Sequence, residues 1–262
     1  MVFLSPRGRS REVPLRAMVP NFITTMALCA GLASLHFSMI GQFDRAMGAV
    51  LVAAVLDVLD GRAARLLRVQ SQFGAVLDSL SDFLAFGVAP VVLIHQLALV
   101  KEDFLGLTSM TVYTLCAALR LARFTSAATR PAVPADGSAA QEAPSAFFQG
   151  LPSPAAAGVV LIPPLLEHSP TVSAYVSFPA WYVVLHTVAT ALLMISTLPM
   201  FSIKRIKISP KVMAPAIVFV GLIVVSMIKD WWLTIASLSG LYLALIPLAV
   251  VLNRRETARV AG

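Results

Sequence analysis

The feature that most constrains this chain is a series of eight long apolar runs, separated by short charged or turn-forming stretches. A helix that crosses a bilayer needs about 20 mostly apolar residues, and each run is close to that length. The sequence therefore predicts an all-α integral membrane protein with eight transmembrane helices. The runs cover residues 18–40, 43–61, 73–99, 106–126, 151–167, 174–200, 212–228 and 231–252.

The composition excludes a soluble globular domain. Hydrophobic residues make up 58% of the 262 residues and charged residues only 13%, whereas soluble domains carry roughly a quarter charged residues. The net charge of +7 would suggest a nucleic-acid partner in a soluble protein. Here the basic residues lie in short connections beside apolar runs, so topology explains them and no nucleic-acid partner is expected.

The distribution of Lys and Arg predicts the orientation of the helices. With eight helices, 17 of the 20 basic residues fall on one side of the membrane, and only Arg45, Lys101 and Lys229 on the other. Basic loops are retained on the cytoplasmic side. Both termini are therefore predicted to be cytoplasmic, and the first helix is expected to remain as a signal anchor behind a basic tail.

Four aspartates occupy positions where an apolar helix should carry none. Asp57 and Asp60 are at i, i+3 near the inner end of the second run, and Asp78 and Asp82 are at i, i+4 near the inner start of the third. Each pair shares a helical face. Ionised carboxylates are costly at membrane depth and four together repel one another, which two divalent cations would compensate. Pairing with the neighbouring arginines and an ion pathway in a transporter are the alternatives.

The spacing of these aspartates forms a motif. Residues 57–82 read DVLDGRAARLLRVQSQFGAVLDSLSD, which is D-x2-D-G-x2-A-R-x8-G-x3-D-x3-D without a mismatch. This stretch resembles the signature of the CDP-alcohol phosphatidyltransferases, integral membrane enzymes that transfer a phosphatidyl or related group from a CDP-linked donor to an alcohol. The resemblance implies a six-helix catalytic core over residues 18–200, with the last two helices as an addition.

The resemblance also implies a role for each motif position. Asp57, Asp60 and Asp78 would bind Mg2+ or Mn2+, with two ions in each active site, and Asp82 would share in metal binding and act as the general base. The remaining motif residues suit a site for the CDP phosphates, because they leave room or offer donors to phosphate oxygens. These CDP-binding candidates are Gly61, Ala64, Arg65 and Gly74.

A second stretch, FFQGLPSPAAAG at residues 147–158, bears on the acceptor alcohol. It resembles the phosphatidylserine synthases of this family, which implies CDP-diacylglycerol and L-serine as substrates, phosphatidylserine and CMP as products, and a homodimer. Glycerol 3-phosphate, an inositol or choline are the alternative acceptors. Serine carries a carboxylate, so its pocket needs a cation. The candidates for contacts with acceptor or phosphate are Arg120, Arg123, Lys204 and Arg205.

The chain is accordingly divided into four parts. Residues 1–17 form a cytoplasmic tail, 18–200 the catalytic core, 201–252 a basic loop with two further helices, and 253–262 a second tail. The long polar connection at 127–148 is expected to be a linker or a cover over the site. The resemblance to bacterial enzymes implies the cytoplasmic (inner) membrane, with the active site facing the cytoplasm.

Overall fold

A computed structural model describes residues 15–69, 71–128, 147–196, 199–201 and 210–260. The elements of this part are α1 (Leu15–Met39), α2 (Phe43–Leu67), α3 (Gln72–Asp82), the π-helix η1 (Phe83–Val88), α4 (Ala89–Ile94), the π-helix η2 (His95–Leu99), α5 (Asp103–Ala128), β1 (Phe147–Gln149), α6 (Ser153–Val160), α7 (Ile162–His168), α8 (Ala180–Ile195), β2 (Pro199–Phe201), α9 (Pro210–Lys229) and α10 (Trp231–Val260). Lys204, Arg205, the first fourteen residues and most of the 127–148 connection lie outside the described residues.

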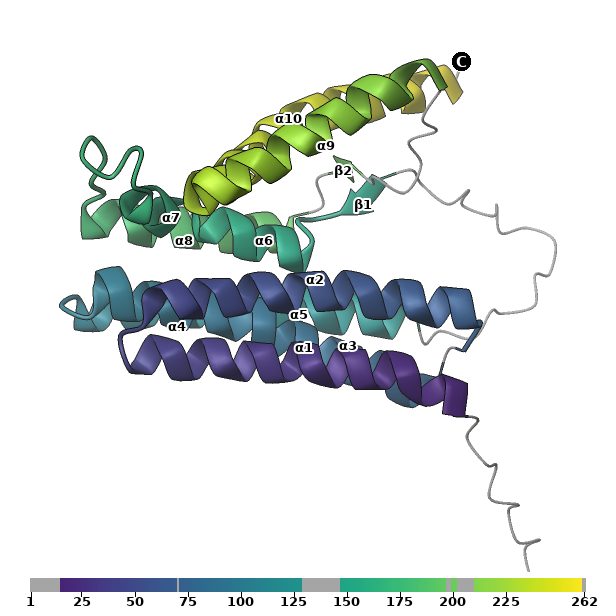
Figure 1. Cartoon of the computed structure of the whole chain (residues 1–262), viewed down its shortest axis with the longest axis horizontal. Coiled ribbons are helices and arrows are strands. Elements are labelled where there is room, and N and C mark those ends of the chain that lie inside the picture. Colours follow the sequence, from purple (N-terminus) through teal and green to yellow (C-terminus); the bar gives the residue numbers. More distant parts are fainter. Residues whose placement is uncertain (1–14, 70, 129–146, 197–198, 202–209, 261–262) are drawn as a thin grey trace, which may run out of the picture.

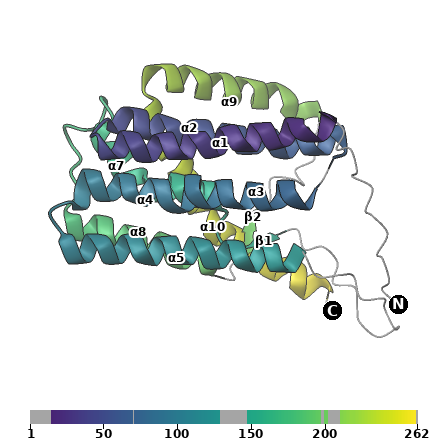
Figure 2. The same cartoon turned by 90° about the horizontal axis from the view of Figure 1, so that it is seen from below.

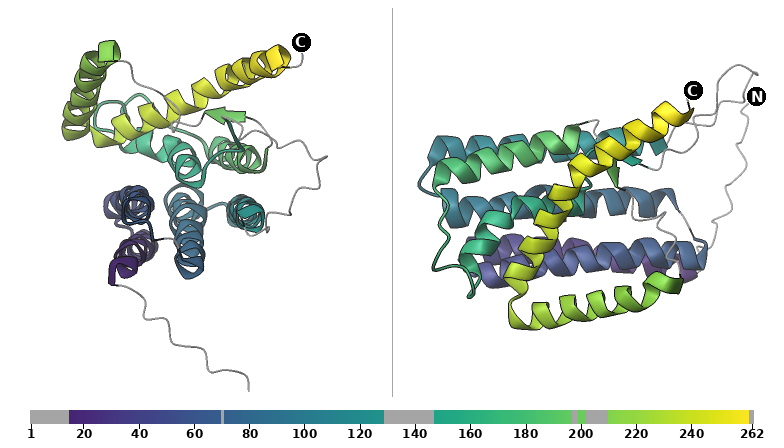
Figure 3. Two further views of the ribbon diagram at one scale, coloured as in Figure 1. Left: turned by 90° about the vertical axis from the view of Figure 1, so that its right-hand side faces the viewer. Right: turned by 90° about the horizontal axis from the view of Figure 1, so that it is seen from above.

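The helices form a bundle with a second, oblique layer. α1 packs along α2, and α3, η1 and α4 continue in one line between α1 on one side and α5 on the other (Figure 2). α8 packs against α5, while α6 and α7 lie between this bundle and α10. The α9–α10 hairpin crosses the bundle obliquely on the side of α6 and α7 (Figures 1 and 3).

Several helices in the described chain are apolar enough for a bilayer. Three helical stretches are also long enough to cross it, Met18–Met39, Gln72–Leu99 and Phe104–Ser126. Three shorter apolar helices accompany them, Ala180–Ile195, Val218–Lys229 and Trp231–Pro247. Large apolar side chains cover much of the outer surface, a pattern that lipid accommodates and water does not. The chain is an integral membrane protein.

The helix ends differ in places from the predicted runs. α2 extends beyond residue 61 to Leu67, so the whole D-G-x2-A-R part of the motif is helical. α10 continues to Val260 rather than ending near residue 252. α8 begins only at Ala180, after Pro179, although the apolar run starts at residue 174. The first turn of α1 and the last turn of α10 lie at the same end of the bundle (Figure 1).

A proline interrupts the third apolar run. Pro90 has no N–H for the carbonyl of Phe86, four residues earlier, and the hydroxyl of the buried Tyr113 donates to that carbonyl instead, at 3.1 Å. The chain forms the π-helix η1 just before this point. A side chain of the neighbouring α5 thus satisfies a backbone group that lipid could not.

The fifth run is interrupted in the same way. Pro163 leaves the carbonyl of Val159 without its helical partner, and His186 Nε2 on α8 donates to that carbonyl at 2.8 Å. The run is divided at this point into α6 and α7. His186 therefore has a structural role between α8 and α6.

The described fold is helical except for one short ribbon, through which the fifth run enters the bundle. β1 pairs with β2 in antiparallel register, with Phe148 opposite Met200. Gly150 then adopts φ +77°, and a Cβ added there would lie 2.6 Å from the Met194 carbonyl oxygen. Glycine is therefore required where the chain turns between β1 and α6 against the end of α8.

Candidate active site

The turn between α2 and α3 brings the two pairs of aspartates to one place. After the last turn of α2, Arg68 adopts a left-handed φ of 53°, and the amide of Val69 donates to the Ala64 carbonyl at 3.1 Å. α3 is capped by Ser71, whose hydroxyl accepts a hydrogen bond from the Gly74 amide at 2.9 Å. These two caps reverse the chain within a few residues, so the two helices run in opposite directions beside α1.

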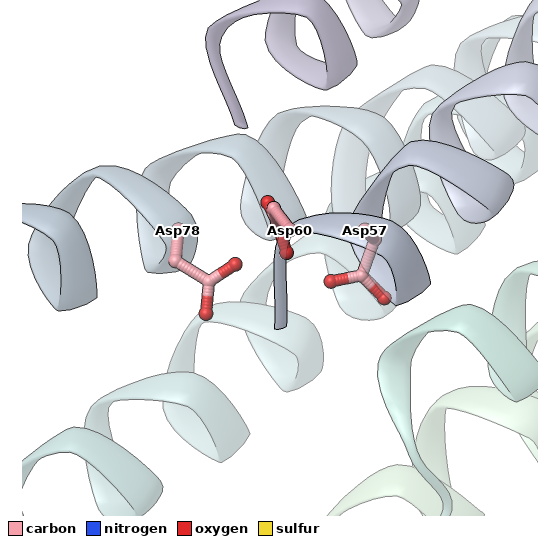
Figure 4. Close-up of side chains that lie close together, drawn as sticks. All are labelled: Asp57, Asp60 and Asp78. Carbon is pink, nitrogen blue, oxygen red and sulfur yellow. The ribbon is translucent and has the colours of Figure 1, made fainter. Parts of the chain in front are cut away.

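Three carboxylates converge beyond this turn. Asp57 and Asp60 on α2 and Asp78 on α3 each offer an oxygen, and these three oxygens lie within 4.8 Å of one another. Figure 4 shows the three side chains next to one another between the two helices. Asp82, one turn along α3, lies outside this group of three but is hydrogen-bonded to Asp57. Two carboxyl groups approach so closely only when a proton or a cation lies between them.

The nearby arginines do not neutralise this cluster. Within the described residues, no ion pair joins an aspartate of the motif to Arg62, Arg65 or Arg68, whose side chains are exposed. The structure therefore lacks the contacts that the salt-bridge alternative requires. Carboxylate oxygens are the ligands that Mg2+ and Mn2+ prefer, so the donor set fits a divalent cation. The three clustered aspartates are the residues that could hold it.

A cavity of about 300 Å³ opens beside the carboxylates. Its wall contains all four of the predicted CDP-binding residues as well as Asp60 and Asp78. A Cβ added at Gly61 would meet only the end of Arg65, at 3.9 Å, so this glycine keeps the cavity open rather than allowing helices to touch. A Cβ at Gly74 would lie 2.8 Å from Asn21 Oδ1, which shows that α3 and α1 approach closely there.

The first helix, α1, also contributes to this site, which was not predicted from the sequence. Pro20, Asn21 and Thr24 of α1 line the same cavity. The Thr24 hydroxyl donates to Asp60 Oδ2 at 2.6 Å and thereby orients the most buried of the three clustered aspartates. Polar residues three apart in an otherwise apolar helix were the available signal, because they lie on one face.

The two predicted acceptor contacts within the described residues, Arg120 and Arg123, have different partners. Arg120 on α5 is directed into the bundle, where its Nη1 donates to the hydroxyl of the buried Ser153 at 2.6 Å. Arg123 is exposed, and its Nη1 donates to the Ile195 carbonyl at the end of α8, at 3.5 Å. Asp82 is close enough to Arg120 for an electrostatic interaction. Of these two arginines, Arg120 is therefore the one associated with the aspartates.

The FFQGLPSPAAAG stretch positions Ser153, the hydrogen-bond partner of Arg120. The glycine turn at residue 150 fixes the start of α6 against α8, where the Leu151 amide donates to the Leu193 carbonyl at 3.2 Å. The first residue of α6 is then Ser153, the partner of Arg120. The segment thus helps to position the Arg120 guanidinium, which interacts electrostatically with Asp82.

Comparison with known proteins agrees with this geometry. The model of the CDP-alcohol phosphatidyltransferase family matches residues 17–192. This chain belongs to that family. It is 31% identical over 250 residues to a CDP-diacylglycerol–serine O-phosphatidyltransferase of Mycobacterium leprae, covering 94% of this chain and 79% of that protein.

Two further relatives carry the same name. The protein of Mycobacterium tuberculosis H37Rv is 32% identical over 245 residues, covering 94% of this chain and 82% of its own. That of Helicobacter pylori 26695 is 29% identical over 232 residues, covering 86% of this chain and 88% of its own. The similarity to the mycobacterial proteins extends over nearly the whole chain, beyond the residues that the family model matches.

Proposed function

We propose that this phosphatidyltransferase transfers the phosphatidyl group of CDP-diacylglycerol to the hydroxyl of L-serine and releases phosphatidylserine and CMP. The observation that carries the proposal is the convergence of Asp57, Asp60 and Asp78 at a cavity lined by the remaining motif residues. The choice of serine is supported by relatives that are named for it and match most of the chain.

The donor's head would occupy the cavity between α1, α2 and α3. Arg65 offers several N–H donors in a plane that suits phosphate oxygens, and Gly61 and Ala64 leave space beside it. The acyl chains of the donor would stay in the surrounding lipid. Binding at this place would bring the donor's phosphates beside the aspartates, which is the positioning that in-line attack requires.

Asp57, Asp60 and Asp78 would hold two divalent ions, Mg2+ or Mn2+, with Asp82 as a further ligand. The chemistry supplied by such ions is neutralisation of the phosphates, which makes CMP a better leaving group. Asp82 takes the proton of the acceptor hydroxyl as that oxygen attacks phosphorus, and the bond to CMP breaks. Thr24 holds Asp60 in the orientation that the cluster needs.

The acceptor would bind on the Arg120 side of Asp82, away from the nucleotide cavity. Arg120 supplies a positive charge for the serine carboxylate there, and Ser153 keeps its guanidinium in place. We propose Arg123, Lys204 and Arg205 as additional contacts for acceptor or phosphate near the membrane surface. The six-helix core over residues 18–200 then carries the chemistry.

The membrane arrangement in this proposal is supported by the excess of Lys and Arg on one side. We propose eight crossings, cytoplasmic termini, and an active site that opens to the cytoplasmic face of a bacterial inner membrane, where a soluble amino acid can reach it. A homodimer is part of the proposal and rests on the family resemblance.

The test is CMP release by the purified chain in detergent with CDP-diacylglycerol and Mg2+ or Mn2+. L-Serine, glycerol 3-phosphate, inositol and choline are compared as acceptors, with and without a chelator. We expect release with L-serine alone, lost on chelation and restored by added metal. Release with another acceptor only would overturn the serine assignment. Release with none of the acceptors would favour the alternative that the aspartates form an ion pathway in a transporter.

A further inference from the structure

One of the polar residues near Arg120 comes from outside the six-helix core. The Arg120 guanidinium interacts electrostatically with Asp82, Tyr242 and Tyr113. Of the two tyrosines, Tyr113 already donates its hydroxyl to the Phe86 carbonyl.

Tyr242 belongs to α10, and α10 packs against α6, the helix that begins at Ser153. A Cβ added at Gly158 of α6 would lie 2.7 Å from the Ser239 hydroxyl of α10, and Tyr242 follows Ser239 by one turn on the same face. Arg120, through Ser153, and Tyr242 therefore both lie beside α6.

Both side chains carry a buried donor without a partner. Among the described residues, Arg120 Nε and the Tyr242 hydroxyl are two of three buried side-chain atoms that make no hydrogen bond. An unsatisfied buried polar group costs folding free energy. Two such groups on side chains that lie beside the same helix, α6, call for an explanation, and a shared ligand would satisfy both.

The chemistry of the two groups indicates what they bind. An arginine Nε–H only donates, and a tyrosine hydroxyl beside a cation donates to an anion. A carboxylate only accepts and offers two oxygens. Ser153 already occupies Nη1 of Arg120 and fixes the guanidinium plane. The free donors therefore suit one carboxylate placed between α5 and α10, on the Arg120 side of Asp82.

We propose that Tyr242 is a specificity-determining residue, whose hydroxyl joins Arg120 Nε in binding the carboxylate of the amino-acid acceptor. This inference rests on the proposed function, since it assumes an acceptor with a carboxylate. It assigns a role to α10, which lies outside residues 17–192 matched by the family model. A helix outside the residues matched by the family model would then contribute to the specificity for the acceptor.

A donor phosphate is the other anion that these groups could contact. Neither Arg120 nor Tyr242 lines the cavity that holds the motif residues, which favours the acceptor. The two sources differ in a measurable way. Loss of a contact with the acceptor raises the KM for L-serine, whereas loss of a contact with the donor raises the KM for CDP-diacylglycerol.

The experiment compares wild type with Tyr242→Phe in the full chain, purified in detergent. We expect the KM for L-serine to rise about 10-fold, as for one hydrogen bond to a charged group, with the KM for CDP-diacylglycerol changed less than about twofold. Serinol, which lacks the carboxylate, is the second acceptor. The preference for L-serine over serinol in kcat/KM should fall by about the same 10-fold.

Tyr182→Phe is the matched control. Tyr182 lies near the start of α8, where its ring stacks on Phe178, at the opposite end of that helix from Ile195. The control should leave both KM values and the preference unchanged. Because Tyr242→Phe removes an unpaired hydroxyl, it should not lower the melting temperature in the absence of substrates. The stabilisation that L-serine adds in the presence of CDP-diacylglycerol should shrink.

Each other outcome overturns the inference. An unchanged KM for L-serine, a rise confined to CDP-diacylglycerol, or an equal loss with serinol and L-serine would show that Tyr242 does not bind the acceptor carboxylate. If wild type releases CMP with glycerol 3-phosphate, inositol or choline but not with L-serine, the proposed function fails first and this inference fails with it. Normal serine-dependent release with an unaffected variant overturns the inference alone.

Discussion

Buried or half-buried carboxylates lie toward both ends of the bundle, and their surroundings differ. Asp230, between α9 and α10, accepts hydrogen bonds from the Ser169 hydroxyl at 2.5 Å and from the Leu233 amide at 3.0 Å. Toward the other end, Asp57 and Asp78 receive no such donors from other residue types within the described chain.

The difference separates a structural carboxylate from the carboxylates that we propose as metal ligands. Burial by itself raises the pKa of Asp230, but the donors from Leu233, Ser169 and Thr171 outweigh it and hold that pKa below its usual value. Asp230 is thereby an N-cap that ties the end of α7 to the α9–α10 hairpin. Asp57, Asp60 and Asp78 instead each direct an oxygen toward one place, at the expense of mutual repulsion, although Asp60 also accepts from Thr24 and Asp57 is hydrogen-bonded to Asp82.

The strongest test of this contrast is Asp78→Asn. We expect CMP release to fall by at least about 1,000-fold, because the substitution removes a metal-binding carboxylate while keeping its shape. Thermal unfolding in detergent without metal should be unchanged or slightly raised in temperature, since one repelling charge is lost. Wild-type turnover by this variant would contradict the assignment of the cluster.

Asp230→Ala should show the reverse behaviour. We expect a loss of stability of about 1–3 kcal/mol, because the Ser169 hydroxyl and the cap of α10 lose their acceptor. CMP release per folded molecule should be unchanged, since Asp230 lies apart from the motif aspartates. Melting temperature measures the first effect, and a variant as stable as wild type would show that Asp230 is not a structural cap.

The stabilisation by Asp230 should also depend on pH. Because folding lowers the pKa of Asp230, its stabilisation is complete above the unfolded value of about 3.9. It should disappear as the pH falls through the lower folded value. The difference in melting temperature between wild type and Asp230→Ala should therefore shrink in acid, and a constant difference would contradict the assigned cause.

Thr24→Val tests whether the first helix takes part in the site. The variant keeps the shape of the side chain and loses the donor to Asp60. We expect kcat to fall about 10-fold, the equivalent of one hydrogen bond to a charged group. Thr24→Ser keeps the hydroxyl and should retain most of the activity. Equal activity of the two variants would show that Thr24 does not orient Asp60.

The two motif glycines give the smallest expected effects. A Cβ in Gly61→Ala meets no atom closer than 3.9 Å, so the variant should slightly stabilise α2, while the KM for CDP-diacylglycerol rises a few-fold as the cavity narrows. Gly74→Ala places its Cβ 2.8 Å from Asn21 Oδ1 and should lower the melting temperature instead. Identical behaviour of both variants would mean that neither glycine has the role assigned to it.

The apolar runs and the motif could be recognised in the sequence because they depend on local chemistry. The cost of placing a polar residue in lipid acts on each segment by itself, so the runs locate most helices to within a few residues. The same cost makes four aspartates at helix ends conspicuous. The spacing of the four aspartates predicted that they would lie together, and the structure groups Asp57, Asp60 and Asp78, with Asp82 hydrogen-bonded to Asp57.

The structure around the interruptions of the helices was harder to predict from the sequence. Pro90 and Pro163 are visible in the sequence, but the groups that satisfy the freed carbonyls, Tyr113 and His186, come from other helices. The β1–β2 ribbon joins segments about fifty residues apart, and each strand is too short, at three residues, to show an alternating pattern. No local signal predicts such pairings.

The sequence by itself determined that this chain is a membrane protein, where its helices run, and which aspartates form a cluster. Only the tertiary structure decided that Thr24 holds Asp60, that Ser153 holds Arg120, and that α10 brings Tyr242 to the same guanidinium. The physical reason is that membrane insertion depends on each segment's own transfer free energy. The side-chain contacts depend on how segments far apart in the sequence pack against one another.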